Sequence, residues 1–206
     1  MPDLYNEGAL GHTPQDPSAV QQLQTNAAKA GEARATTLEP HHVEHLLKEL
    51  GSPAAVDAAV RYGARSITTE EARRMGFRLF VNGKAQTSSG LFLPFGGKFG
   101  QLRCDNPPLN ARGEPAKYLN RARSKAEPAI FGDGEPTHAT EGWKDALRLH
   151  LELGTTTCAI AGVGHWPLLP GSIRQLIYDA DASTNPGVWG QLIKACLLYT
   201  SPSPRD

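Results

Sequence analysis

Three carboxylate side chains in the second half of the chain each follow a short apolar segment. Glu141 follows segment 138–140, and Asp179 and Asp181 follow segment 176–178. In an open α/β sheet the carboxyl ends of the strands line the ligand crevice, so we expect these residues to converge. Carboxylates in one crevice repel one another unless a cation lies among them, and Mg²⁺ prefers such hard oxygen ligands. The pattern predicts a magnesium site formed by all three.

Two other interpretations of these carboxylates remain open. Taken singly, Glu141 is well placed to cap the helix that follows it, and Asp179 to cap a strand-to-helix turn. Asp179 and Asp181 together also suit a phosphatase-like site with an aspartyl nucleophile and its acid partner. That motif usually opens its domain, whereas here a strand ending in Glu141-Gly142 comes first.

The elements around these residues alternate between strands and helices. A strand ending at Thr140 leads to a helix whose apolar face combines Trp143, Ala146, Leu147 and Leu151, and Gly154 caps its end. Strands are then expected over 156–161 and 176–178, followed by a helix over 188–195. This alternation predicts a parallel sheet with right-handed crossovers.

The preceding part divides into a helical segment, 39–76, and a basic α+β subdomain, 77–135. Apolar spacing over 43–50, a Ser52-Pro53 start and a capping box over 68–71 predict three short helices. Helices of this kind could form a helix-turn-helix DNA-binding motif, but the second helix has few side chains suited to reading DNA bases. Strands are expected over 77–81, 90–95 and 101–105, with a hairpin turn over 96–100.

Two groups of side chains in this part suggest binding. Arg121, Arg123 and Lys125 form a basic cluster that suits a phosphate backbone, although a solvated loop has the same composition. His41, His42 and His45 have a spacing compatible with zinc. Because no third Cys or acidic ligand stands at a recognisable spacing, we expect all three to be surface histidines.

The order of these motifs resembles a known fold. A strand, Glu141-Gly142, a helix and then a strand with Asp179-x-Asp181 are similar to the Toprim fold of bacterial primases, topoisomerases and several nucleases. Segments 90–95, 100–103 and Pro115-Ala-Lys-Tyr-Leu-Asn120 resemble the basic subdomain that precedes Toprim in bacterial-type primases. The arrangement over 39–195 is also similar to an uncharacterised Toprim-like domain of plasmid and phage replication proteins, often found ahead of a helicase-like ATPase.

The resemblance implies an α/β fold: a truncated Toprim-like domain with a Rossmann-like parallel sheet over 136–195, preceded by the small α+β primase-like subdomain. It implies Mg²⁺-dependent primase-like nucleotidyl transfer on single-stranded DNA. Asp179 and Asp181 would hold Mg²⁺ and nucleotide phosphates, and Glu141 would be a further ligand or the general base. The expected DNA or nucleotide contacts are Arg103, Lys117, Tyr118, Arg121, Arg123 and Lys144.

The chain departs from primases in two places. No cysteine-rich zinc-binding segment precedes the expected core, and the loop after Asp181 reads Ala-Ser-Thr-Asn where Toprim proteins commonly have a glycine-containing turn. A second functional interpretation is therefore a non-catalytic Toprim-like module that binds DNA or a helicase.

Composition bounds these interpretations. The chain has 206 residues and a formal net charge of zero, so any nucleic-acid contact requires a local basic patch. No apolar run approaches the length of a membrane span and the first residues lack signal-peptide features, which predicts a cytoplasmic protein with no membrane partner. Residues 1–38 are predicted to be a mostly flexible arm. Residues 196–206 resemble the in-frame translation of a sequencing adapter, which predicts a natural chain that continues beyond Ala195.

Overall fold

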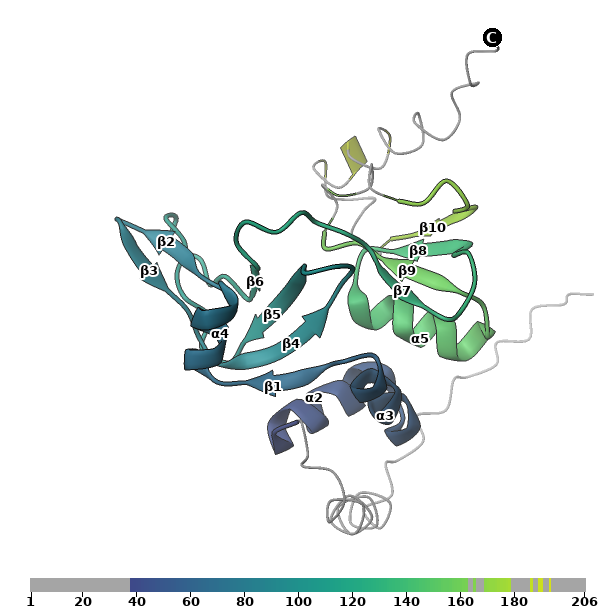
Figure 1. Ribbon diagram of the computed structural model, residues 1–206, viewed down its shortest axis with the longest axis horizontal. Helices are drawn as coiled ribbons and strands as arrows, with labels where there is room; N and C mark the ends of the chain where they lie inside the picture. The colour runs from purple at the N-terminus through teal and green to yellow at the C-terminus, as the bar shows by residue number, and fades with distance from the viewer. Residues whose placement is uncertain are drawn as a thin grey trace, which may run out of the picture. The chain divides into compact units, whose positions relative to one another are not determined.

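The computed structural model describes residues 38–162, 165, 169–178, 186, 189, 190 and 193 (Figure 1). The chain divides into two units, 1–36 and 37–206, and every described residue belongs to the second. The predictions for the N-terminal arm, the 182–185 loop and the adapter-like end concern positions outside the described residues, apart from Leu38. The described part mixes helices with three sheets, which confirms the α/β class. None of its helices has the length and apolar character needed to cross a membrane.

The three predicted N-terminal helices are confirmed. Ser52 Oγ accepts the backbone N–H of Ala55 at 3.2 Å and Thr68 Oγ1 accepts that of Glu71 at 3.2 Å, so both predicted N-caps form. Gly51 and Gly76 end their helices in the left-handed conformation, where a side chain is disfavoured. The helices are α2 (Pro40–Leu50), α3 (Pro53–Arg61) and α4 (Thr69–Met75).

The first sheet is antiparallel and has the order β1-β4-β5-β6. Its centre is the predicted hairpin of β4 (Gly90–Pro94) and β5 (Gly100–Cys104). The outer strands are β1 (Arg65–Ile67) and β6 (Tyr118–Asn120), and neither was predicted. A separate hairpin pairs β2 (Leu79–Val81) with β3 (Lys84–Gln86), so the strand expected over 77–81 is shorter than predicted.

The second sheet has the order β10-β8-β9-β7. Strands β8 (His138–Thr140), β9 (Thr157–Ala159) and β10 (Gln175–Ile177) are parallel, as predicted. The edge strand β7 (Ala129–Phe131) runs antiparallel to β9 and was not predicted. Helix α5 (Trp143–Leu153) connects β8 to β9 and ends at Gly154, as the sequence indicates.

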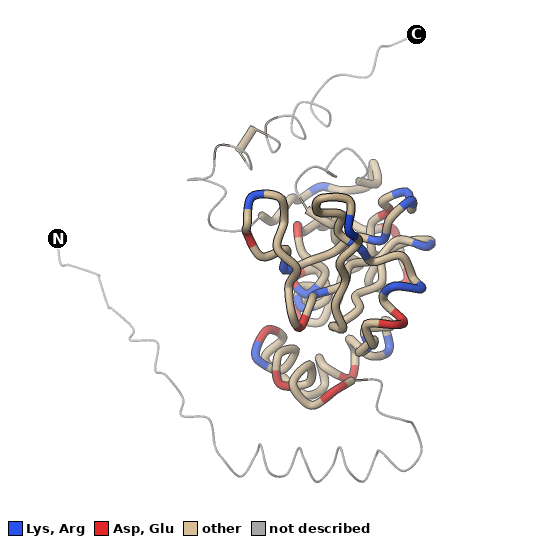
Figure 2. The backbone as a smooth tube through the Cα atoms, turned by 90° about the vertical axis from the view of Figure 1, so that its left-hand side faces the viewer, with Lys and Arg blue, Asp and Glu red and all other residues tan. Residues whose placement is uncertain are grey.

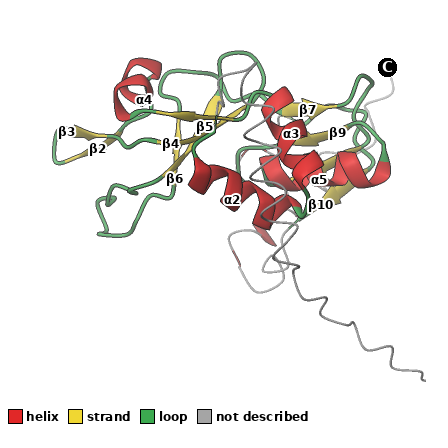
Figure 3. Ribbon diagram, turned by 90° about the horizontal axis from the view of Figure 1, so that it is seen from below, coloured by secondary structure: helices red, strands yellow, loops and turns green. Residues whose placement is uncertain are grey.

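One hydrophobic core joins elements from both sheets. Its buried residues come from α2, α3, β4, the β4–β5 turn, β7, α5 and β9. Figure 3 shows α2, α3 and α5 grouped together, and α4 with the β2–β3 hairpin farther along the molecule. The indole of Trp143 is buried in this core, and its Nε1–H donates to the carbonyl oxygen of Pro94 in β4. The start of α5 is thereby fixed against the first sheet.

The buried apolar face of α5 covers less of the helix length than predicted. Trp143, Ala146 and Leu147 are buried, but the Leu151 side chain is 43% exposed. The expectation that Leu151 completes the core face is therefore wrong. The buried residues of α5 all lie in its first half, and Leu151, one turn after Leu147 on the same stripe, reaches solvent.

This difference predicts that truncating two leucines one helical turn apart lowers the free energy of unfolding by unequal amounts. Leu147 is 0% exposed, so Leu147→Ala removes buried methyl groups and should lower the free energy of unfolding by about 2–5 kcal/mol. Leu151→Ala has the same chemistry at an exposed site and should cost less than about 1 kcal/mol. Urea unfolding monitored by circular dichroism measures both. Equal losses would contradict the placement of the core.

Candidate functional site

The two parallel neighbours of β8, strands β9 and β10, lie on opposite sides of it, so the strand order reverses there. The chain passes from β8 through α5 to β9 on one side of β8, and β10 then pairs with β8 on its other side. This is a topological switch point, and ligands of open α/β sheets bind at the carboxyl ends of the strands beside it. Glu141 directly follows β8 at this edge and is half-buried.

The N-cap position of α5 belongs to the residue after Glu141. Gly142 occupies the N-cap position of α5, and it supplies no side-chain hydrogen bond. Glu141 therefore lies one residue before the N-cap position, and its role as a cap of α5 stays a prediction.

The other two predicted carboxylates follow β10. Ile177 is paired with Thr140, so the ends of β10 and β8 lie next to each other in register. Asp179 comes two positions after Ile177 in the chain, and Glu141 one position after Thr140. Asp179 and Asp181 lie outside the described residues, so their convergence with Glu141 stays a prediction. An all-carboxylate donor set of this kind fits Mg²⁺, which prefers hard oxygen ligands.

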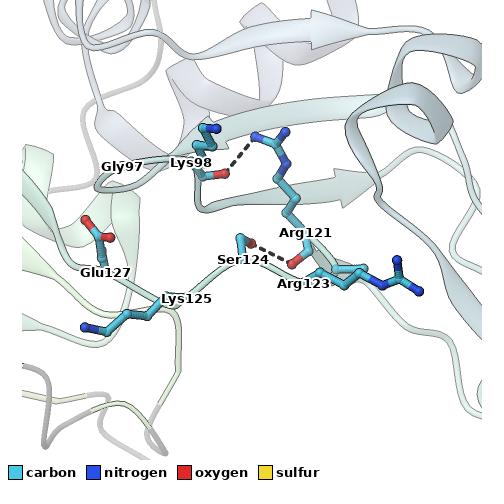
Figure 4. Close-up of a pocket in the computed structure, with 8 residues that line it drawn as sticks. Gly97, Lys98, Arg121, Arg123, Ser124, Lys125 and Glu127 are labelled. Carbon is cyan, nitrogen blue, oxygen red and sulfur yellow. Dashed lines mark hydrogen bonds between the residues drawn. The ribbon is translucent and has the colours of Figure 1, made fainter.

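A basic pocket of about 420 Å³ lies between the β4–β5 turn and the segment after β6 (Figure 4). Arg121 Nη1 donates to the carbonyl oxygen of Lys98 at 2.8 Å, and Ser124 Oγ donates to that of Arg121 at 2.8 Å. The first bond connects the two segments that form the pocket, and the second stabilises the segment after β6. The lining residues are Gly97, Lys98, Arg121, Ala122, Arg123, Ser124, Lys125 and Glu127.

The charges of this pocket favour an anionic ligand. Four basic side chains line it against one acidic side chain, Glu127, although the whole chain has no net charge. Figure 2 shows both signs mixed along the helices at the bottom, and several basic positions close together among the segments above them. The sequence predicted the cluster of Arg121, Arg123 and Lys125. It did not predict that Lys98, a residue of the β4–β5 turn, would join this cluster.

The pocket lies beside the segment that follows β9. Ala126, Glu127 and Pro128 line a small crevice together with Ile160, Ala161 and His165. The rings of Phe99 and His165 lie 6.3 Å apart between centroids, which joins the β4–β5 turn to the same place. Since β8, β9 and β10 are parallel, the basic pocket is close to the edge at which Glu141 lies.

Two further predicted contact residues pair on the first sheet. Arg103 of β5 is directly opposite Tyr118 of β6, so their side chains share one face of the sheet. Arg103 is half-buried and Tyr118 is exposed. Lys117 is also exposed, and its carbonyl oxygen accepts the backbone N–H of Cys104. Arg103, Lys117 and Tyr118 do not line the basic pocket, so the structure places the predicted contact residues in separate groups.

Lys144 joins α5 to α2. Its Nζ donates to Glu49 Oε2 at 2.7 Å and lies 3.4 Å from His45 Nε2, and its side chain is only 14% exposed. The hydrogen bond from Lys144 lowers the pKa of Glu49. Burial, followed by the charges of Lys144 and Arg103, lowers the pKa of His45 to about 4. His45 is therefore neutral at pH 7.

The prediction that the three α2 histidines lie on the surface is wrong for His42 and for His45, and holds only for His41. The His42 side chain is 1% exposed, compared with 58% for His41 and 16% for His45. Burial lowers the pKa of His42 despite an opposing hydrogen bond with Asp105. This burial could not be predicted from the sequence, because Asp105 is far along the chain and follows β5.

No protein-family model matches the chain, and no curated protein matches it.

The lowered pKa of His45 predicts a loss of stability in mild acid. Between about pH 6.5 and 4 the unfolded chain binds a proton at His45 that the folded chain does not, so stability falls as the pH falls. His45→Gln should make the decrease in unfolding free energy between pH 7.5 and pH 5 smaller by about 2 kcal/mol. Urea unfolding at both pH values measures the difference. An unchanged decrease would contradict the burial of a neutral His45.

Proposed function

We propose that the chain is a Toprim-like module of a DNA replication protein that carries out Mg²⁺-dependent, primase-like nucleotidyl transfer on single-stranded DNA. The observation that carries this proposal is the switch point at β8. Glu141 follows β8, the strand that leads to Asp179-x-Asp181 is its parallel neighbour, and a pocket lined by four basic residues lies close to the same edge.

The two groups of charges have complementary roles in this proposal. Mg²⁺ held by Glu141, Asp179 and Asp181 would supply stabilisation of the charge that develops on phosphate oxygens during transfer. Glu141 is also suited to accept a proton from the attacking hydroxyl, because it is half-buried at the strand end. Arg121, Arg123 and their basic neighbours would hold the phosphate backbone of the template beside that edge.

Arg103 and Tyr118 would contribute a second contact surface. A guanidinium group binds phosphate, and an exposed tyrosine ring offers a face on which an unpaired base can stack. Their direct cross-strand pairing puts both chemistries on one face of the first sheet. In the proposal Lys117 adds charge at this surface, and Lys144 acts chiefly by holding α5 against α2 through Glu49.

One specific observation favours a second candidate, a non-catalytic nucleic-acid-binding module. The basic pocket is built from the β4–β5 turn and segment 121–127, and Glu141, the one predicted carboxylate among the described residues, does not line it. Binding would therefore persist without a competent metal site. The phosphatase-like alternative uses only Asp179 and Asp181, and it gives no role to Glu141 or to the pocket.

Replacement of the carboxylates should separate catalysis from binding. In a primer-synthesis assay with nucleotides and single-stranded DNA, Asp179→Asn with Asp181→Asn should reduce Mg²⁺-dependent product at least about 100-fold. Single-stranded DNA binding measured by fluorescence anisotropy without Mg²⁺ should change less than about threefold, because removing two negative charges weakens no phosphate contact. Synthesis at the wild-type rate in the double variant would disprove the catalytic role. DNA binding without any Mg²⁺-dependent synthesis by the wild type would favour the non-catalytic module.

Replacement of two pocket cations should weaken binding in a salt-dependent way. Arg123→Gln with Lys125→Gln removes two exposed charges from the pocket, so the slope of log affinity against log salt concentration should become shallower by about 1.4. Lys84→Gln with Arg112→Gln removes the same charge from exposed positions outside the pocket and serves as the matched control. Anisotropy titrations of single-stranded DNA at several salt concentrations measure the slopes. Equal slopes for the two double variants would argue against the pocket as the template site.

A further inference from the structure

Two histidines at the start of α2 meet an aspartate that follows β5. The Nε2 atoms of His41 and His42 lie 3.2 Å and 2.8 Å from the same oxygen, Asp105 Oδ1. One ligand atom from each residue lies within 4.8 Å of the other two. The two imidazole rings are 4.0 Å apart between centroids and tilted by 43° relative to each other. Two nitrogen donors and one oxygen donor therefore face a common point.

Neighbouring hydroxyl groups fix the orientation of this cluster. Ser89 Oγ donates to Asp105 Oδ2 at 2.7 Å, which holds the carboxylate in place. Ser66 Oγ accepts the backbone N–H of Glu39 at 2.6 Å and lies 2.7 Å from His42 Nδ1. His42 is thus held through Nδ1, and its Nε2 is directed at Asp105. Protein metal sites commonly hold a ligating histidine through its other ring nitrogen in this way.

We propose that His41, His42 and Asp105 form a binding site for a divalent transition metal such as Zn²⁺. Two ligand atoms that are each about 2.0–2.1 Å from a tetrahedral zinc ion lie roughly 3.3 Å from one another. The distances of 3.2 Å and 2.8 Å from Asp105 Oδ1 to the two nitrogens need only a small expansion to admit the ion. His42 Nε2 then binds the metal, and the ring proton moves to Nδ1, where it is donated to Ser66 Oγ.

The donor set selects the class of metal. Imidazole nitrogen suits zinc and related first-row ions, whereas Mg²⁺ and Ca²⁺ prefer oxygen ligands. His42 is buried and neutral, the state in which an imidazole binds a metal. Three protein ligands leave a further coordination position, and His41, which is 58% exposed, leaves room for water there. The charge of Arg103 opposes a cation at this place, and the carboxylate of Asp105 offsets it.

This site is distinct from the carboxylates of the proposed catalytic centre. It connects α2 to the end of β5, so a bound metal would cross-link the helical segment to the first sheet. The inference does not rest on the proposed function, and it uses none of the residues that line the basic pocket.

Metal binding by the untagged chain tests the proposal. After removal of metals with a chelator, Zn²⁺ titration by isothermal calorimetry in 10 mM Mg²⁺ should show one site per chain, because excess Mg²⁺ competes for carboxylates but not for imidazoles. His41→Gln and Asp105→Asn should each weaken this site at least about tenfold. His41 is exposed, so its replacement leaves the buried His42–Asp105 bond and the fold intact.

Two matched variants and one spectroscopic measurement complete the test. His45→Gln removes an imidazole that lies on the same helix but outside the ligand set. Asp179→Asn with Asp181→Asn removes the competing carboxylates. The Zn²⁺ affinity of both variants should be within about twofold of the wild-type affinity. Co²⁺ bound to the wild type should give the visible absorption of a tetrahedral nitrogen–oxygen site, and His41→Gln should abolish it. The proposal is overturned if the wild type binds no Zn²⁺, or if His41→Gln binds it as tightly as the wild type does.

Discussion

The attachment of the first turn of α5 to the first sheet is the constraint on which the candidate site depends. Trp143 is buried in the shared core and donates to Pro94, and Lys144 bonds Glu49 of α2. Gly142 and Glu141 come immediately before these two anchors. The contacts of Trp143 and Lys144 therefore hold the turn after β8 in place, and Glu141 remains at the carboxyl edge of the parallel sheet. The same contacts bring the β4–β5 turn, with Lys98, toward that edge.

The close approach of two segments shapes the basic pocket. A β-carbon at Gly96 would lie 2.8 Å from Glu127 Cβ and 2.8 Å from the carbonyl oxygen of Pro128. Gly96 also donates its backbone N–H to that carbonyl oxygen at 3.1 Å. A glycine at this position lets the β4–β5 turn contact segment 121–128 directly. Four cations are consequently held around one pocket, where each adds to the attraction for an anion.

Local signals in the sequence predicted the elements of the fold well. Ser52 and Thr68 act as helix caps, and Gly51, Gly76 and Gly154 end their helices, because each effect needs only neighbouring residues. The apolar alternation of β4 and β5 likewise indicated a hairpin. Strands β1 and β7 are three residues each and acquire their role by pairing with distant strands, so periodicity alone gave no sign of them.

In the candidate sites, too, contacts between residues that are distant in the sequence could not be predicted. The grouping of Arg121 and Arg123 could be predicted because they are near neighbours in sequence, but the contribution of Lys98 depends on the packing of a turn. His42 and Asp105 are 63 positions apart, and no spacing rule connects them. Leu151 was misassigned because helical periodicity defines a stripe of residues and does not say how far along the helix the core extends. Tertiary packing decided each of these cases.

We propose that a divalent cation binds at the carboxyl edge beside Glu141. Paramagnetic broadening by substoichiometric Mn²⁺ in amide NMR spectra of the chain tests it most directly, because Mn²⁺ takes the oxygen ligands that Mg²⁺ takes. We expect the amide signals of residues 140–144 and 178–182 to broaden first and to recover when Mg²⁺ is added in excess. Sharp signals for residues 140–144, with broadening confined to other parts of the chain, would contradict the proposal.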